Sequence, residues 1–153
     1  MKKIVTFLLV FSFSVLSFSF VKAQQKDPVC WTYEAKKKTG NTYDLVITAT
    51  LPKPWHIYSQ NSGADGPIPT AITFNANPLI VKTGKIVETG KLIKAYDENF
   101  KTNVLSYSNK VVFTQTIKLK TAAKTTVMGS VDYMVCDDEK CLPPTKKTFS
   151  IKL

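Results

Sequence analysis

Two of the three cysteines, Cys136 and Cys141, lie close enough in the sequence to form an internal disulfide. The four residues between them are Asp137-Asp138-Glu139-Lys140. An alternating segment ends at Val135 and a new strand is expected after Pro143-Pro144, so the pair should lie at the mouth of a hairpin. Facing residues of a hairpin have Cα atoms ~4.5–5.5 Å apart, within the usual disulfide range of ~4.4–6.8 Å. The spacing therefore permits a disulfide, either structural or active in thiol–disulfide exchange.

The residues alone leave both kinds of disulfide open. Structural bonds are the commoner kind in secreted proteins, but closing a loop of about six residues constrains the unfolded chain by only ~2 kcal/mol. The acidic run 137–139 disfavours thiolates on its neighbours, so the pair should be a poor spontaneous nucleophile. It would suit a disulfide that a partner's thiolate attacks. The alternative is a non-catalytic interaction protein, in which Trp55, Tyr58 and a lysine-rich surface bind a partner.

Metal binding is a weaker interpretation of the same residues. Two cysteines make half of a tetrahedral zinc site, and His56 is the only histidine. Met128 and Met134 could join the thiolates around Cu(I), although a methionine on an alternating strand usually just packs. We therefore expect no metal and no cofactor. Cys30, the odd cysteine, is predicted to be a buried free thiol.

Other classes of function fit poorly. The chain shows no catalytic triad and no paired carboxylates of a hydrolase, and His56 is expected to be structural. Its formal net charge is +10 at pH 7, and every basic residue is a lysine. Because no arginine is present to bind phosphates bidentately and the lysines are spread along the chain, nucleic acid is a poor candidate partner.

The first 23 residues have the pattern of an export signal. Lys2 and Lys3 precede an uncharged run from Ile4 to Phe20, and Val21-Lys22-Ala23 resembles a small-residue cleavage site. We expect residues 1–23 to be removed, the mature protein to begin at Gln24, and no stable membrane insertion to remain. The mature chain keeps 18 lysines against 11 acidic residues, a net charge of +7. Export to the periplasm would place the cysteines where disulfides persist.

The mature chain is dominated by segments that alternate apolar and polar residues. Four such faces stand out, and each has the period of two that is typical of a strand. They are Tyr43, Leu45, Ile47, Ala49 and Leu51; Val111, Phe113, Ile117 and Leu119, with Gln115 as an exception; Val127, Gly129, Val131, Tyr133 and Val135; and Phe149, Ile151 and Leu153. Shorter candidates are Trp31–Ala35, Ile57–Ser59, Ala71–Phe74, Ile86–Glu88 and Val104–Tyr107.

Turn signals separate these strands, and no window shows a helical stripe. The expected turns are Thr39-Gly40-Asn41, Gly63–Pro69, Asn75–Pro78 and Thr89-Gly90. Eight or nine short strands with regular turns predict an all-β protein, a β-sandwich formed by a single domain over residues 26–153.

Three blocks of sequence together resemble one known family. They are Pro54-Trp55-His56-Ile57-Tyr58-Ser59-Gln60 with Gly66-Pro67-Ile68-Pro69-Thr70, then Tyr96-Asp97-Glu98-Asn99-Phe100, then residues 131–144 with Cys-x4-Cys-x-Pro-Pro. In this order they resemble the N-terminal periplasmic domain of the DsbD family of transmembrane thiol:disulfide reductases. The resemblance spans about residues 30–153 and implies an immunoglobulin-like β-sandwich.

The resemblance also implies roles for individual residues. Cys136 and Cys141 correspond to the redox pair, and Cys141 is expected to form the mixed disulfide with partners. Phe100 would be a cap over the disulfide. Asp97, Glu98 and Tyr58 would lie near the cysteines.

In that family, reducing equivalents pass to this domain and then to other periplasmic proteins. The expected donor is a thioredoxin-like or transmembrane thiol reductase. The expected acceptors are periplasmic disulfide isomerases or thioredoxin-like proteins of cytochrome c maturation. The 153 residues include neither a transmembrane nor a thioredoxin-like domain, so we expect a separate protein to reduce the pair.

Overall fold

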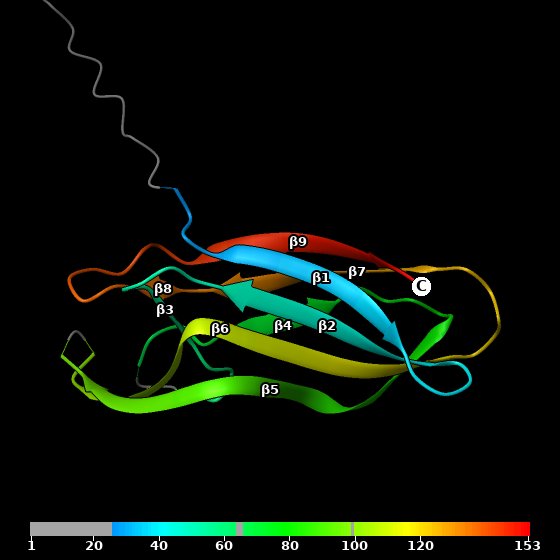
Figure 1. Cartoon of the computed structure of the whole chain (residues 1–153), viewed down its shortest axis with the longest axis horizontal. Helices are drawn as coiled ribbons and strands as arrows, with labels where there is room; N and C mark the ends of the chain where they lie inside the picture. Colours follow the sequence, from blue (N-terminus) through cyan, green and yellow to red (C-terminus); the bar gives the residue numbers. More distant parts are fainter. Residues whose placement is uncertain (1–25, 64–65, 99) are drawn as a thin grey trace, which may run out of the picture.

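The computed structural model of the chain describes residues 26–63, 66–98 and 100–153. The predicted export signal and Gln24 lie outside these ranges. The described residues form nine strands, β1 to β9 (Figure 1). Within the same ranges, no helix has the length and apolar character needed to cross a membrane.

The larger sheet is built around one long strand, β6 (Thr102–Leu119). Its second half pairs with β2 (Thr42–Thr50) and a short stretch of its first half pairs with β3 (His56–Tyr58). Along most of its length β6 also pairs with β5 (Ile80–Asp97). The remaining members are β1 (Cys30–Lys37), which pairs with β2, and β8 (Val135–Cys136), which pairs with β3. All of these pairings are antiparallel.

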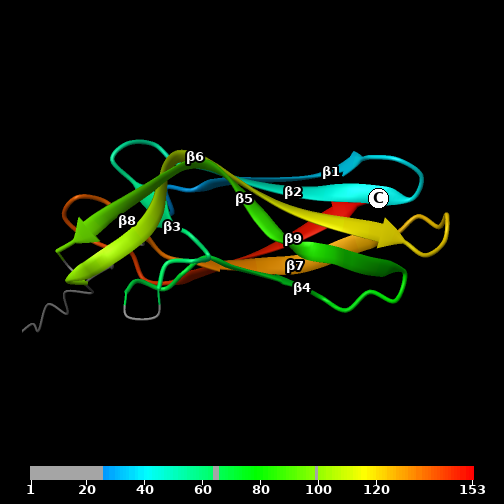
Figure 2. The ribbon, with the colours of Figure 1, turned by 90° about the horizontal axis from the view of Figure 1, so that it is seen from below.

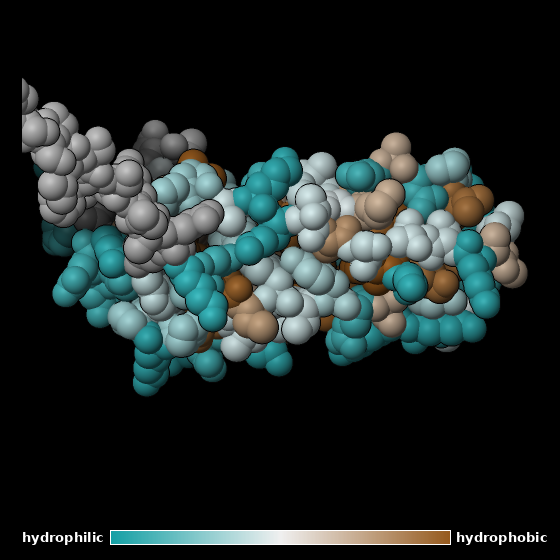
Figure 3. All heavy atoms as spheres, turned by 90° about the horizontal axis from the view of Figure 1, so that it is seen from above, coloured by the Kyte–Doolittle hydropathy of each residue, from teal (hydrophilic) through white to brown (hydrophobic). Residues whose placement is uncertain are grey.

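The smaller sheet has three antiparallel strands in the order β4 (Ala71–Phe74), β7 (Thr126–Tyr133) and β9 (Thr145–Lys152). Figure 2 shows the two sheets as stacked layers, with β1, β2 and β6 in one and β4, β7 and β9 in the other. The structure therefore confirms the predicted all-β, immunoglobulin-like sandwich. The hydrophilic side chains are spread over the face seen in Figure 3, between small hydrophobic areas.

The core lies between the sheets and uses the alternating faces that the sequence predicts. Leu45, Ile47 and Ala49 of β2 are buried against Val127 and Val131 of β7, because successive side chains of a strand point to opposite faces. Gln115 interrupts its apolar face and is nevertheless buried. Its side-chain amide donates hydrogen bonds to the backbone oxygens of Thr83 and Thr116, at 3.0 and 2.9 Å. Gln115 is thus a buried polar side chain whose amide group is hydrogen-bonded, and it lies beside a register shift in β5.

The prediction of a turn at Thr89-Gly90 is wrong, because both residues lie inside the 18-residue strand β5. A Cβ atom on Gly90 would lie 3.0 Å from the backbone oxygen of Lys110 and 3.0 Å from the ring of Tyr107. Glycine is therefore needed there for close approach to β6 rather than for a turn. The short segment expected at Ile86–Glu88 is one part of this strand, and the segment at Val104–Tyr107 is one part of β6.

The chain changes sheets at Met134, between β7 and β8. Tyr133 ends a strand that pairs with β9, and Val135 begins one that pairs with β3. The strand predicted over 127–135 is therefore two strands. This crossing carries Cys136 into the larger sheet, at the end of the sandwich where β3 and β8 lie in Figure 1.

Candidate functional site

The two cysteines form a disulfide across the mouth of a tight hairpin, as the spacing permits. They face each other as an antiparallel bridge, and their Cα atoms are 4.0 Å apart, slightly closer than we expected. The backbone N–H of Leu142 donates to the oxygen of Val135 at 2.9 Å. The side chain of Cys136 is 1% exposed, whereas Cys141 is half-buried. Of the two sulfur-bearing residues, Cys141 is the more accessible.

The acidic loop between the cysteines folds around Asp137. Its Oδ1 atom accepts hydrogen bonds from the backbone N–H groups of Glu139 and Lys140, at 2.9 and 2.8 Å. These bonds hold the pKa of the Asp137 carboxyl below its usual value. The loop therefore keeps a negative charge beside the disulfide at neutral pH.

Tyr58 provides the polar contact to the disulfide. The residue is fully buried, and its hydroxyl lies 3.0 Å from Sγ of Cys136 and 3.1 Å from Oδ2 of Asp97. Burial, together with the Asp97 carboxylate, raises the pKa of the Tyr58 phenol well above its usual value. Tyr58 therefore stays protonated and can donate a hydrogen bond to a sulfur or to a carboxylate.

Asp97 and Phe100 come from the tip of the long β5–β6 hairpin. The Oδ1 atom of Asp97 lies 3.4 Å from the backbone nitrogen of Phe100, while Oδ2 accepts the bond from Tyr58. The Phe100 ring meets the Tyr58 ring edge to face, with 6.1 Å between the centroids. Phe100 packs on the buried cluster of Tyr58, Val104 and Cys136, as does Cys141. The hairpin thus brings a phenylalanine ring and a carboxylate to the disulfide.

Glu98 lies in the same region, beside Asp97. It lines an open pocket of about 350 Å³ next to the disulfide hairpin. Asp97 lines this pocket too, as do Asp137 and Asp138 of the hairpin loop. Four carboxylates therefore surround a depression at this end of the molecule.

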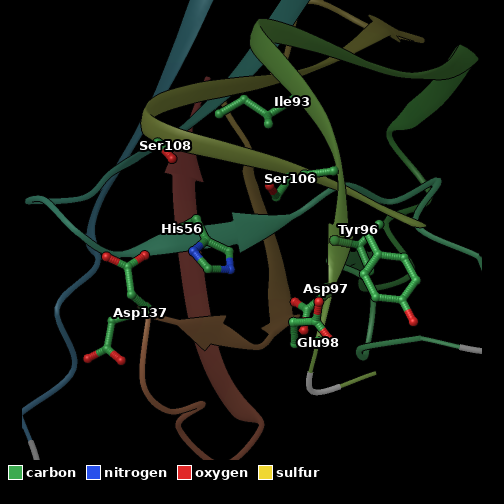
Figure 4. A pocket seen from close by; sticks show the side chains of 11 residues that line it. His56, Ile93, Tyr96, Asp97, Glu98, Ser106, Ser108 and Asp137 are labelled. Atoms are coloured by element: carbon green, nitrogen blue, oxygen red, sulfur yellow. The ribbon is translucent and has the colours of Figure 1, made fainter. Parts of the chain in front are cut away.

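His56 belongs to the site, although the sequence analysis predicted only a structural role for it. It is the cross-strand Cα partner of Cys136, and its Nε2 atom lies 3.3 Å from the Tyr58 hydroxyl oxygen. Figure 4 shows its ring in the pocket between Asp137 and Asp97. A signal was present in the sequence, because residues 56 and 58 of one strand point to the same face.

One expectation for the sulfur-containing residues is changed by the structure. Cys30 is exposed, so the prediction of a buried thiol is wrong. It is the first residue of β1, and the alternation that turns Trp31 inward turns Cys30 outward. Met134 packs beside the disulfide cluster, whereas Met128 lies exposed on β7. In the described part of the chain, no three of the residues His, Cys, Asp and Glu are grouped to hold a metal ion.

A two-sheet β-sandwich with a disulfide hairpin at one end is the class of protein that the fold and the site define. The chain belongs to the family of the N-terminal domain of thiol:disulfide interchange protein DsbD, which it matches over residues 21–153. No curated protein sequence matches the chain significantly.

Solved structures share the fold at low sequence identity. The reduced DsbD N-terminal domain of Neisseria meningitidis superimposes with a TM-score of 0.52 at 13% identity, covering 79% of this chain and 83% of that one. The N-terminal periplasmic domain of ScsB from Proteus mirabilis gives 0.52 at 16% identity, covering 82% and 44%. A complex between the DsbD and PilB N-terminal domains of N. meningitidis gives 0.51 at 13% identity, covering 78% and 80%.

Proposed function

We propose that this protein is an exported thiol–disulfide exchange module that relays reducing equivalents through Cys136 and Cys141. The observation that carries the proposal is the asymmetry of the pair. One sulfur is buried against the hydroxyl of Tyr58, and the other belongs to a more accessible residue that packs on the same cluster as Phe100. Exchange requires one sulfur that a thiolate can reach and another that leaves. Membership of the DsbD N-terminal family supports the same chemistry.

In this proposal a partner thiolate attacks Sγ of Cys141 and the electron pair of the broken bond leaves on Cys136. A covalent link joins the partner to Cys141, and Cys136 ends as a thiol. A second thiolate of the partner then attacks the partner's linked sulfur, so the partner gains a disulfide and Cys141 is freed as a thiol. In the opposite direction Cys141 attacks a partner's disulfide, and Cys136 then attacks Cys141 and releases the reduced partner. Phe100 would restrict the attack to partners that displace its ring.

The partners proposed are thiol proteins of the same compartment. A thioredoxin-like or transmembrane reductase would supply the electrons, and disulfide isomerases or thioredoxin-like proteins of cytochrome c maturation would accept them. The periplasm is the proposed location, with cleavage before Gln24. Two similar structures, a periplasmic domain of ScsB and a complex of DsbD with PilB, support a periplasmic role with protein partners.

A direct test is exchange with a reduced thioredoxin-like protein. We expect oxidised wild-type protein to take up its electrons, as measured by alkylation of the two new thiols, and the Cys136→Ser/Cys141→Ser variant to take up none. The proposal would be contradicted if reduced thioredoxin transferred no electrons and dithiothreitol reduced the same bond only in the unfolded protein.

The double variant also distinguishes an exchange pair from a structural disulfide. We expect Cys136→Ser/Cys141→Ser to remain folded and to lose about 2 kcal/mol or less of unfolding free energy, because the closed loop is short. Chemical denaturation measures the loss, with Cys30→Ser as a control that leaves the disulfide intact. A double variant that cannot fold at ordinary temperature would show that the bond is a structural staple.

A further inference from the structure

The sulfur of Cys136 lies where a negative charge is unfavourable. The residue is 1% exposed, and the Asp97 carboxylate lies on the other side of the Tyr58 hydroxyl. Burial and a nearby carboxylate both disfavour a thiolate. Exchange nevertheless passes through a Cys136 thiolate, either leaving or attacking. A proton must therefore reach and leave this sulfur from a nearby group.

The Tyr58 hydroxyl is the group in contact with the sulfur, and it has three polar neighbours. These are Sγ of Cys136 at 3.0 Å, Oδ2 of Asp97 at 3.1 Å and Nε2 of His56 at 3.3 Å. A hydroxyl carries one proton and can accept another hydrogen bond on its oxygen. While the disulfide is intact, the carboxylate is the stronger acceptor; a thiolate formed at Cys136 competes for the same proton.

His56 connects this buried hydroxyl with the pocket. It lies on β3 directly across from Cys136, and its ring lines the pocket (Figure 4). On the side of β6, the neutral side chains of Ser106 and Ser108 face it. The Tyr96 ring points away from it in Figure 4. The charged or titratable groups that share its surroundings are Tyr58 on β3, Asp97 and Glu98 at the end of β5, and Asp137 and Asp138 after β8.

We propose that Cys136 exchanges its proton with His56 through the Tyr58 hydroxyl, an inference that rests on the proposed exchange function. When a partner thiolate attacks Cys141, the sulfur–sulfur bond breaks and its electron pair goes to Cys136. Tyr58 gives its proton to this sulfur and takes one from the protonated imidazole. The products are a thiol, an unchanged tyrosine and a neutral imidazole. In the reverse direction the thiol loses its proton by the same route and attacks Cys141.

Asp97 is the competing proton partner, and general chemistry favours the imidazole. An imidazole ordinarily titrates near ~6.5, and acid–base transfer works best when the pKa lies near the operating pH. Burial lowers the pKa of His56, while Asp97, Asp138 and Asp137 partly oppose that shift. His56 is therefore mainly neutral at pH 7 and suited to accept the proton of Cys136. Asp97 instead positions Tyr58 and the Phe100 loop.

The test is the pH dependence of disulfide reduction by dithiothreitol, expressed per dithiothreitol thiolate. In the wild type, the rate constant should fall as pH rises through the titration of His56, because the protonated imidazole disappears. The inflection is expected below ~6.5, the usual imidazole value. At acidic pH, His56→Gln and Tyr58→Phe should each be slower by roughly tenfold, less than the ~10²–10⁴-fold of a fully effective general acid. Both variants should show a flat profile.

Two variants serve as controls. Tyr107→Phe also removes a buried hydroxyl that donates to a carboxylate, Oε2 of Glu88 at 2.9 Å, but this hydroxyl does not contact the sulfur. It should keep the wild-type profile. Asp97→Asn should change the rate and keep an inflection, moved to lower pH, because the carboxylate that raises the pKa of His56 is gone. The double variant His56→Gln/Tyr58→Phe should be no slower than the slower single variant, since both residues serve one route.

The outcomes separate this inference from the proposed function. A His56→Gln variant that keeps the inflection, or one slowed equally at every pH, overturns the proton route while exchange itself stands. If the inflection is lost in Asp97→Asn but kept in His56→Gln, the proton comes from the carboxylate of Asp97. That result also overturns the proton route through His56. A folded wild-type protein whose disulfide dithiothreitol cannot reduce would overturn the proposed function and the proton route together.

Discussion

Cys136→Ser is expected to accumulate mixed disulfides with partner proteins, whereas Cys141→Ser is expected to trap none. The reason is the difference in access between the two cysteines. Cys136 is almost completely buried beneath Tyr58, and Cys141 is the half-buried member of the pair. A partner can reach Cys141, and only Cys136 is placed to release that partner afterwards. Removing the releasing thiol leaves the covalent intermediate in place.

The measurement is non-reducing electrophoresis of each variant after incubation with an oxidised thioredoxin-like protein. The difference between the single variants should be all-or-none rather than graded. Cys30→Ser in the Cys136→Ser background is the matched control, because Cys30 is an exposed free thiol that could form adventitious adducts. Adducts that survive this second change form through Cys141. Trapping by Cys141→Ser instead would reverse the roles of the two cysteines.

Phe100→Ala should accelerate reduction of the disulfide by dithiothreitol by about two- to tenfold. The ring packs on the cluster that contains Cys136 and Tyr58, and Cys141 packs on the same cluster. A sulfur–aromatic contact contributes ~0.3–1.5 kcal/mol, and about 1.4 kcal/mol corresponds to a factor of ten. Without the ring, a larger fraction of molecules would expose the bond to a small thiol.

The rate is followed by the appearance of free thiols under conditions where both proteins are folded. Tyr96→Ala is the matched control, because Tyr96 is an aromatic residue of the same hairpin but is 56% exposed. Its rate should equal that of the wild type. Equal rates for Phe100→Ala and the wild type would mean that the ring does not protect the disulfide, and the proposed cap would have to be abandoned.

The fold was predictable because most of its core follows the alternation of strands. Leu45, Ile47 and Ala49 could be assigned to one buried face from the sequence alone, and they lie on that face. The length of β5 could not be predicted in this way. Its outer residues Val81 and Val87 are exposed, so the burial pattern is weak, and Gly90 has the appearance of a turn residue until the close approach of β6 is seen.

The site was predictable in part. The hairpin disulfide followed from spacing, and the resemblance to the DsbD family indicated the neighbourhood of Tyr58, Asp97 and Phe100. The place of His56 could not be predicted, because it depends on the long-range pairing of β3 with β8. Tyr58 of β3 and Cys136 of β8 are 78 residues apart in the sequence. Sequence periodicity places His56 and Tyr58 on one face of a strand. Only the order of the strands in the sheet shows that this strand lies beside the one that carries Cys136.

The reduction potential of the Cys136–Cys141 pair tests the central claim most directly. It is measured by equilibrating the folded protein in buffers of defined thiol–disulfide ratio and counting free thiols by alkylation. A structural disulfide typically has a potential below about −300 mV, whereas an exchange-active pair lies well above that value. We predict a potential well above about −300 mV, within reach of thioredoxin-like reductants. A potential below about −300 mV would contradict the account and identify the bond as a structural staple.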